Sequence, residues 1–151
     1  PKGFKEAYQQ FVDGGWNGLT ADEEFGGQAL PRALAMAVQE LWQASNISLA
    51  LCGLLNQGAI EAITAHGTDV QKQKYLPKLV SGEWTGTMNL TEPQAGSDVG
   101  AVRTRAVPQP DGSYKIHGQK IYISYGDHDM AQNIVHLVLA RVDGAPAGTK
   151  G

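Results

Sequence analysis

Apolar residues at the start of the chain recur at the spacing of an amphipathic helix. Phe4, Tyr8 and Phe11 fall three or four residues apart, with mostly polar residues between them. Residues at this spacing lie on one side of an α-helix, so the pattern predicts a short helix. Gly14 and Gly15 follow, and glycine is favoured just past the C-terminus of a helix. We therefore expect the first helix to end there.

A second helical pattern begins after the Gly-rich connection WNGLTADEEFGGQAL. Pro31 suits the first turn of a helix, where its missing N–H costs nothing. Leu34, Val38 and Leu41 then keep one apolar face. The following stretch, NISLALCGLLNQGAIEAITAHG, is apolar almost all round, which is typical of a helix that is buried on most sides.

The stretch GTDVQKQKYLPKLVSGEW carries its own helix start signal. Thr68 and Gln71 match the capping box, in which each side chain accepts a hydrogen bond from the backbone N–H of the other residue. A proline inside a helical pattern usually ends the helix, so we expect this helix to stop near Pro77. The spacing over residues 1–83 therefore predicts a helical domain.

The pattern changes from Trp84 onward. The stretches YKIHGQKIYIS and NIVHLVLARV are rich in β-branched and aromatic residues, which favour strands. PQPDGSY is typical of a hairpin turn in which Gly112 takes a positive φ angle. We therefore predict an α+β chain, with a helical domain over residues 1–83 and a β domain over residues 84–151.

Composition and charge exclude several classes of function. Hydrophobic residues make up 42% of the chain and charged residues 18%, which is ordinary for a globular protein. The formal net charge is −3 and no Lys/Arg cluster occurs, so we expect no nucleic-acid partner. The longest apolar run, Ile47 to Leu55, is well short of the ~20 residues that a membrane-spanning helix needs, so we expect no membrane span.

No metal site is expected either. Cys52 is the single cysteine, so neither an intrachain disulfide nor a cysteine-based metal site can form, and we interpret it as a small buried hydrophobic residue. His128 stands between Asp127 and Asp129, but three consecutive residues on one loop cannot converge on an ion without further ligands. A solvated loop is the simpler interpretation.

The junction between the two halves, MNLTEPQAGSDVGAVRTRA, is rich in small polar residues. Gly96 beside Ser97 offers an open backbone next to a hydroxyl donor, which is a suitable arrangement for a phosphate group. On these residues alone, a surface turn explains Gly-Ser-Asp after a proline more simply.

The wider context favours the phosphate interpretation. LTEPQAGSDVGAVRTRA resembles the flavin-binding signature of the acyl-CoA dehydrogenase family, and YKIHGQKIYIS resembles its second flavin-contacting strand. GTDVQKQKYLPKLVSGEW is similar to the lead-in from helix to sheet, and LTADEEFGGQ to an N-terminal turn of the family. GDHDMAQNIVHLVLAR and APAGTKG resemble a bacterial subgroup that includes methylthiopropanoyl-CoA dehydrogenases.

The resemblance implies a helical N-terminal domain followed by a β-barrel middle domain, each of them partial. A C-terminal four-helix bundle is expected but absent from this chain, which starts without an initiator Met and which we interpret as a piece of a longer protein. In the family the catalytic base is a Glu from that bundle or from a neighbouring helix, so no catalytic residue is assigned in this chain. By family position, Glu92 shapes the loop. We expect these residues alone to be inactive.

The resemblance also implies which residues contact FAD. Ser97 matches the residue that meets the FAD pyrophosphate and the pantetheine part of acyl-CoA, so it is also the predicted substrate-binding residue. Thr91 and Leu90 match positions at the pyrimidine edge of the flavin. Gln94 departs from the glycine common at its position in the family. The predicted cofactor-binding set is Met88, Leu90, Thr91, Gly96, Ser97, Tyr122, Ile123 and Ser124.

Tyr122 and Ser124 match the aromatic and hydroxyl positions of the second motif, where the aromatic ring packs against the isoalloxazine and the hydroxyl bonds flavin N5. Strand alternation would place both on one face of the sheet, opposite Ile121 and Ile123. An ordinary solvent-facing pair is the alternative interpretation.

By resemblance, the function is FAD-dependent α,β-desaturation of an acyl-CoA thioester, with electrons passed to an electron-transferring flavoprotein. An acyl-CoA oxidase, or a relative of the same fold that keeps FAD without dehydrogenase activity, is the alternative. Family members are homo-oligomers, usually dimers or tetramers. A bacterial protein of this kind would be cytoplasmic, and a eukaryotic one would lie in the mitochondrial matrix.

Overall fold

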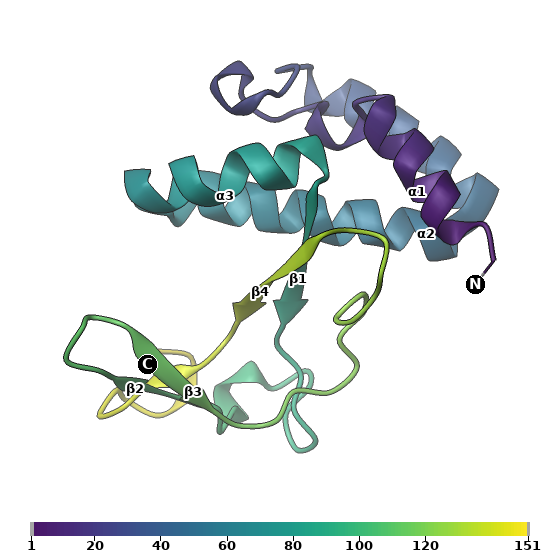
Figure 1. The fold of residues 1–151 in the computed structure, drawn as a ribbon. Helices are drawn as coiled ribbons and strands as arrows, with labels where there is room; N and C mark the ends of the chain where they lie inside the picture. The colour runs from purple at the N-terminus through teal and green to yellow at the C-terminus, as the bar shows by residue number, and fades with distance from the viewer. Residues whose placement is uncertain (1, 151) are drawn as a thin grey trace. The chain divides into compact units, whose positions relative to one another are not determined.

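The computed structural model describes residues 2–150, and they form two compact units (Figure 1). The first unit contains the chain up to Thr87 together with Ser124–His136, and the second contains Met88–Ile123 together with the chain from Leu137 onward. The first is mainly helical and the second contains a small sheet, which agrees with the order of helical and β parts predicted from the sequence.

The first helix, α1, spans Phe4–Asp13 and is capped by Gly14, as the spacing of its apolar residues predicts. Its buried residue is Tyr8, whose hydroxyl donates a hydrogen bond to the Gly82 carbonyl at 2.9 Å. Two short 3-10 helices follow, Trp16–Gly18 and Glu23–Phe25.

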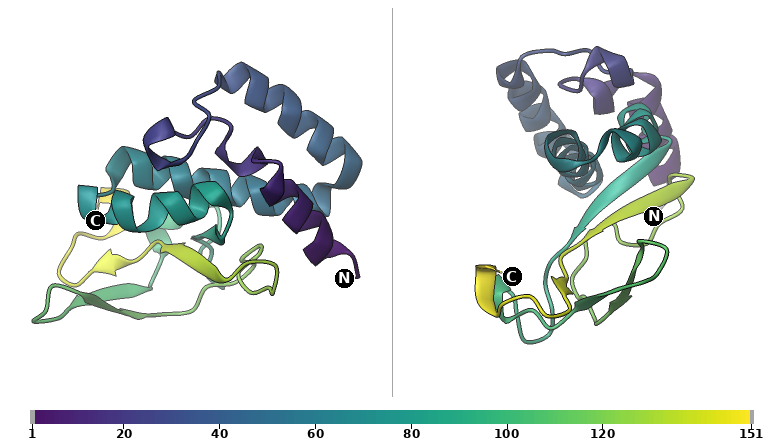
Figure 2. Two further views of the ribbon diagram at one scale, coloured as in Figure 1. Left: turned by 45° about the horizontal axis from the view of Figure 1, so that its top comes forward. Right: turned by 90° about the vertical axis from the view of Figure 1, so that its left-hand side faces the viewer.

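The long helix α2 spans Arg32–His66 and starts directly after Pro31, which is its N-cap. At Asn46 the backbone is non-helical, with φ −158° and ψ 90°, and Figure 2 shows the sharp bend that results. The prediction that residues 46–67 form a helix buried on most sides is wrong. Only Cys52, Asn56, Ala59, Ile60 and Ile63 are buried, because a single face of the second half packs into the core of the unit.

By length and composition alone, α2 is apolar enough to cross a membrane. The core helix of a soluble protein meets the same criterion, so this is weak evidence for a span. Helix α3 contacts α2, and Cys52 of α2 packs in a core cluster with Tyr8 and Met130.

Helix α3 spans Asp69–Ser81, and its start confirms the predicted capping box: Gln71 N–H donates to Thr68 Oγ1 at 3.3 Å and Thr68 N–H to Gln71 Oε1 at 2.9 Å. The predicted stop at Pro77 is wrong, because the helix continues to Ser81 and ends at Gly82. Proline removes one backbone hydrogen bond. Burial of the apolar side chains around it offsets this loss; the buried residues of α3 are Leu76, Leu79 and Val80.

Two strands run from the first unit into the second. Strand β1 spans Trp84–Asn89, beginning where the sequence pattern changes, and strand β4 spans Asn133–Val138; they pair with each other. In the first unit β1 packs closely on α2. A Cβ atom added at Gly86 would lie 2.3 Å from the Cβ of Ala59, so only glycine permits this approach.

The second unit holds a three-stranded sheet in the order β3-β2-β5. Strands β2, Arg105–Pro108, and β3, Tyr114–His117, are antiparallel, and β5, Arg141–Val142, runs parallel to β2. The turn between β2 and β3 confirms the predicted hairpin, with Gly112 at φ 82°. Two 3-10 helices, Val99–Ala101 and Gly148–Lys150, complete the unit.

The strands of the predicted β domain form one two-stranded and one three-stranded sheet across residues 2–150, as expected of a partial middle domain. One detail of this domain differs from the prediction. Residues 119–123 are irregular rather than a strand. Tyr122 has φ 58°, a left-handed conformation that breaks the expected alternation of side chains.

Candidate functional site

The loop that begins at Met88 is held in shape by its own backbone. Glu92 N–H donates to the Ala95 carbonyl at 2.8 Å, and Ala95 N–H donates back to the Glu92 carbonyl at 3.1 Å. Asp98 starts the next short helix and accepts from Gly100 N–H at 3.1 Å. The residues between Ala95 and Asp98 are therefore fixed at both ends.

The centre of this loop is the carboxylate of Glu92, which is 4% exposed. It accepts hydrogen bonds from the backbone N–H groups of Arg103 at 2.7 Å and Thr104 at 2.9 Å. The side chains of Lys120, at 2.9 Å, and Gln94, at 2.6 Å, donate to it as well. A buried charge is tolerated only when it is paired and hydrogen-bonded, and both conditions are met here.

These contacts decide the protonation state of Glu92. Burial by itself raises the pKa of the carboxyl group, but the hydrogen bonds from Thr104, Arg103 and Lys120 outweigh it and hold the pKa well below its usual range. A carboxylate with such a low pKa and so many donors is a poor proton acceptor. Glu92 therefore organises the loop and does not act as a base.

Lys120 connects this loop to the segment around Tyr122. Its Nζ lies 2.9 Å from Glu92 Oε1 and 2.8 Å from the carbonyl oxygen of Leu90. Ile121 N–H donates to the Thr91 carbonyl at 3.0 Å, so a backbone hydrogen bond reinforces the connection. The two stretches with flavin-motif resemblance are thus joined within the second unit.

The hydrogen-bond donors of Gly96 and Ser97 are open. Both residues are exposed, and within residues 2–150 neither the Ser97 hydroxyl nor the backbone N–H of either residue has a hydrogen-bond partner. A Cβ at Gly96 would lie 3.9 Å from Thr91 Cγ2, an ordinary contact, so the fold itself does not require glycine here. Open N–H and hydroxyl donors on a fixed loop fit an anionic group such as a pyrophosphate.

The other predicted site residues are also accessible. Met88 and Leu90 are each 37% exposed, Tyr122 is 88% exposed, and Thr91 is half-buried. Ile123, the last residue of its segment in the second unit, is half-buried, and Ser124 belongs to the first unit. The expectation that Tyr122 and Ser124 share one face of a strand is wrong, because this segment is not a strand.

Lys120 was not singled out from the sequence, and Gln94 was noted only as a departure from the family pattern. Lys120 directly precedes Ile121, Tyr122 and Ile123, and a cation beside such residues is a signal for an ion pair, but its partner Glu92 is 28 residues away. Gln94 replaces the glycine expected at its position, and its side chain closes the cluster by donating to Glu92 Oε2. Only the folded chain brings these three side chains together.

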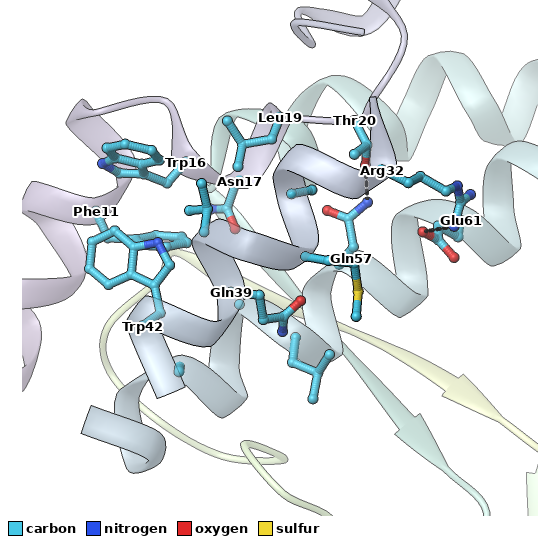
Figure 3. A pocket seen from close by; sticks show the side chains of 16 residues that line it. Phe11, Trp16, Asn17, Leu19, Thr20, Arg32, Gln39, Trp42, Gln57 and Glu61 are labelled. Atoms are coloured by element: carbon cyan, nitrogen blue, oxygen red, sulfur yellow. Dashed lines mark hydrogen bonds and ion pairs between the residues drawn. The ribbon is translucent and has the colours of Figure 1, made fainter. Parts of the chain in front are cut away.

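A pocket of about 220 Å³ lies within the first unit (Figure 3). Its aromatic wall is made by Phe11, Trp16 and Trp42, with edge-to-face contacts between ring centroids at 5.1 Å for Phe11–Trp42 and 5.6 Å for Trp16–Trp42. Gly53 and Gln57 of α2 both line the pocket, because residues four apart lie on the same face of a helix.

Four of the polar side chains that line this pocket are paired with each other. Gln57 donates to Thr20 Oγ1 at 2.8 Å, and Arg32 forms an ion pair with Glu61 at 2.8 Å (Figure 3). Both partners of the ion pair are exposed, so it contributes little stability. The aromatic wall suits an apolar ligand group, while the buried Asn17 Nδ2 in the lining has no hydrogen-bond partner among the described residues.

Cys52 and His128 take structural positions. Cys52 is 1% exposed, and burial raises the pKa of its thiol to about 12, so it is no nucleophile at neutral pH. His128 is half-buried rather than fully solvated, with Nε2 3.0 Å from Thr85 Oγ1 and Nδ1 accepting from Met130 N–H at 3.2 Å. In the described part of the chain no group of three or more His, Cys, Asp or Glu side chains could hold a metal ion.

Comparison with protein families gives two matches in sequence. The family model for the N-terminal domain of acyl-CoA dehydrogenase matches residues 2–83, and the model for its middle domain matches residues 87–151. Together they account for nearly the whole chain.

Individual relatives agree with these matches. The chain is 54% identical over 151 residues to 3-methylmercaptopropionyl-CoA dehydrogenase of Ruegeria pomeroyi, covering 100% of this chain and 26% of that protein. The chain thus spans about a quarter of the length of the curated relatives it matches first.

Solved structures share the fold. Acyl-CoA dehydrogenase complexed with FAD from Bacillus anthracis has a TM-score of 0.82 at 28% identity, covering 93% of this chain and 24% of that one. A chain in a structure of the electron-transferring flavoprotein of Acidaminococcus fermentans has a TM-score of 0.77 at 31% identity, covering 82% of this chain and 32% of that one.

Proposed function

Because the chain belongs to the acyl-CoA dehydrogenase family, we propose that it is part of an FAD-dependent enzyme that introduces a double bond between the α and β carbons of an acyl-CoA thioester. The observation that carries this proposal is the loop at Gly96 and Ser97. Its donors are exposed and unused within the described residues, while the buried Glu92 cluster holds the loop in place.

The proposed roles come from the family resemblance, and the exposure of these residues supports them. Ser97, with the N–H groups of Gly96 and Ser97, holds the FAD pyrophosphate, and Ser97 also contacts the pantetheine part of acyl-CoA. Met88, Leu90 and Thr91 line the flavin through backbone groups and the Thr91 hydroxyl. Tyr122, with Ile123 and Ser124 beside it, covers the ring system; the 88% exposure of Tyr122 leaves its ring free for such a contact.

Bound FAD would accept the two electrons and the β-hydrogen that leave the substrate. The residues of this chain would orient the cofactor and exclude water from it, and donors near the flavin N1 and O2 positions would stabilise the charge that develops on reduction. The low pKa of Glu92 excludes it as the base that removes the α-proton. We assign that base to a residue outside residues 1–151.

The wider assignments rest on the relatives. The likeness to a chain of an electron-transferring flavoprotein structure supports such a protein as electron acceptor. We propose a homo-oligomer, a dimer or a tetramer, and a cytoplasmic location in a bacterium, as for the family's bacterial members. We also propose that the helical domain ends at Glu83 and the β domain begins at Trp84.

The test is spectroscopic. We expect the purified full-length protein to be yellow and to be bleached anaerobically by a short- or medium-chain acyl-CoA, because reduction removes the visible absorption of the flavin. Bleaching rates with C4 to C16 acyl-CoAs would define the chain length. Rapid reoxidation by air in place of the flavoprotein acceptor would indicate an oxidase, and a colourless protein that takes up no FAD would refute the proposal.

A further inference from the structure

The side chain of Lys120 is the one direct side-chain link between the loop at Leu90–Ala95 and the segment at Lys120–Ile123 among the hydrogen bonds of the described residues. Its Nζ donates to the Leu90 carbonyl at 2.8 Å and to Glu92 Oε1 at 2.9 Å. The side chain is 9% exposed, and that of Glu92 is 3% exposed. Because little water reaches this ion pair, its two side chains are held in one arrangement.

We propose that Lys120 is a positioning residue that holds the two flavin-contacting segments of the second unit in register. This inference rests on the proposed function, because it gives Lys120 a part in shaping the flavin site. Lys120 itself need not touch the cofactor. It acts through Leu90, whose carbonyl it fixes, and through Glu92, whose charge it balances.

The chemistry of lysine suits this task. An ammonium group has three N–H donors and no acceptor, so one side chain can bond a carbonyl and a carboxylate at once. The Ile121 N–H bond to the Thr91 carbonyl at 3.0 Å adds a backbone contact next to it. Without the ammonium group, the Leu90 carbonyl loses its donor and the buried Glu92 carboxylate loses its counter-charge, so the loop from Met88 to Ser97 would lose its fixed shape.

The first experiment replaces Lys120 in the full-length protein. Lys120→Met keeps the length of the side chain and removes its charge and donors. We expect the affinity of the apo-protein for FAD to fall about ten- to a hundredfold, as for the loss of hydrogen bonds to charged groups. Amide hydrogen exchange in the apo-protein should become faster in peptides covering residues 88–97 and 119–123.

Lys115→Met is the matched control. Lys115 lies on β3 in the same unit, is exposed, and its side chain has no hydrogen bond or ion pair among the residues that the structure describes. We expect this variant to bind FAD like the wild type and to exchange at the wild-type rate.

The double variant Lys120→Met/Glu92→Gln separates positioning from charge balance. It removes the uncompensated carboxylate but leaves the Leu90 carbonyl without its donor, so we expect FAD affinity to stay low and amide hydrogen exchange in residues 88–97 to stay faster than in the wild type. Full recovery of both would show that Lys120 is only a counter-ion and would overturn the inference. So would wild-type affinity and exchange in Lys120→Met. A wild-type protein that takes up no FAD would instead refute the proposed function.

Discussion

At the scale of single residues, the loop separates groups that hold the fold from groups that are open to a ligand. Glu92 is buried and fully bonded, whereas Ser97 is exposed with no partner for its hydroxyl among the described residues. The two residues are therefore expected to respond differently to substitution.

The first prediction concerns Ser97. If its hydroxyl donates to the pyrophosphate, Ser97→Ala in the full-length protein removes a charge-assisted hydrogen bond worth about 1.5 to 3 kcal/mol. Affinity for FAD, or for acyl-CoA if that contact dominates, should fall about ten- to a hundredfold. Titration of apo-protein with FAD measures the affinity for the cofactor. Titration of holo-protein with a non-reducible acyl-CoA analogue measures the affinity for the substrate separately.

Ser48→Ala is the matched control, since Ser48 is exposed on α2 and its hydroxyl has no hydrogen bond within residues 2–150. Gln94→Ala is unsuitable as a control, because the Gln94 side chain donates to the buried Glu92 at 2.6 Å. Unchanged affinity for both ligands in Ser97→Ala, with lower thermal stability, would mean that the stretch is only a turn.

The second prediction concerns the pH dependence of stability. Because the pKa of Glu92 is lower in the folded state than in the unfolded state, its contribution is present above the ordinary carboxyl pKa of about 4.3 and is lost as the pH falls toward the folded-state pKa. Glu92→Gln keeps the shape but not the charge. It should therefore be less stable than the wild type at pH 7, and the difference should narrow below about pH 4.3.

Thermal unfolding of both full-length proteins across this pH range is the measurement. Glu40→Gln serves for comparison, since Glu40 is exposed on α2 and its side chain has no hydrogen bond or ion pair in the described part of the chain. A stability difference for Glu92→Gln that stays constant as the solution is acidified would contradict the assigned ionisation state.

At the scale of elements, the close packing of β1 on α2 gives the third prediction. A Cβ at Gly86 would lie 2.3 Å from Ala59 Cβ, so Gly86→Ala must displace one of the two elements. Such overpacking costs about 1 to 3 kcal/mol, and the melting temperature should fall. At Gly58, which lies on α2, an added Cβ would have no other atom within 4 Å. Gly58→Ala should therefore raise the free energy of unfolding by about 0.4 to 1 kcal/mol.

Calorimetry on the two variants would compare them directly. Equal stability of Gly86→Ala and the wild type would mean that β1 is not held this closely against α2 in the full-length protein.

At the scale of the whole molecule, the two compact units are not contiguous in sequence. The chain leaves the first unit after Thr87, returns at Ser124 and leaves again after His136. Each unit is therefore completed by a segment that is distant in sequence. Ser124 thus belongs to the helical unit, although it directly follows Ile123 of the sheet-containing unit.

Local signals in the sequence determined the elements that depend on neighbouring residues. The capping box at Thr68 and Gln71 marked the start of α3, Gly14 marked the end of α1, and the turn at Gly112 marked a hairpin. The motif around Ser97 also identified the family, because its residue types recur in a fixed order. All of these signals act over a few residues, where backbone hydrogen bonding and φ preferences decide the outcome.

Only the tertiary structure decided features that depend on distant partners. α3 continues past Pro77 because its apolar side chains are buried, and Tyr122 leaves the strand conformation in a segment that bonds back to Leu90, Glu92 and Thr91. The pairing of Glu92 with Lys120 could not be predicted either. The free energy of a buried ion pair depends on the desolvation and hydrogen bonds of both partners, and these exist only once the chain has folded around them.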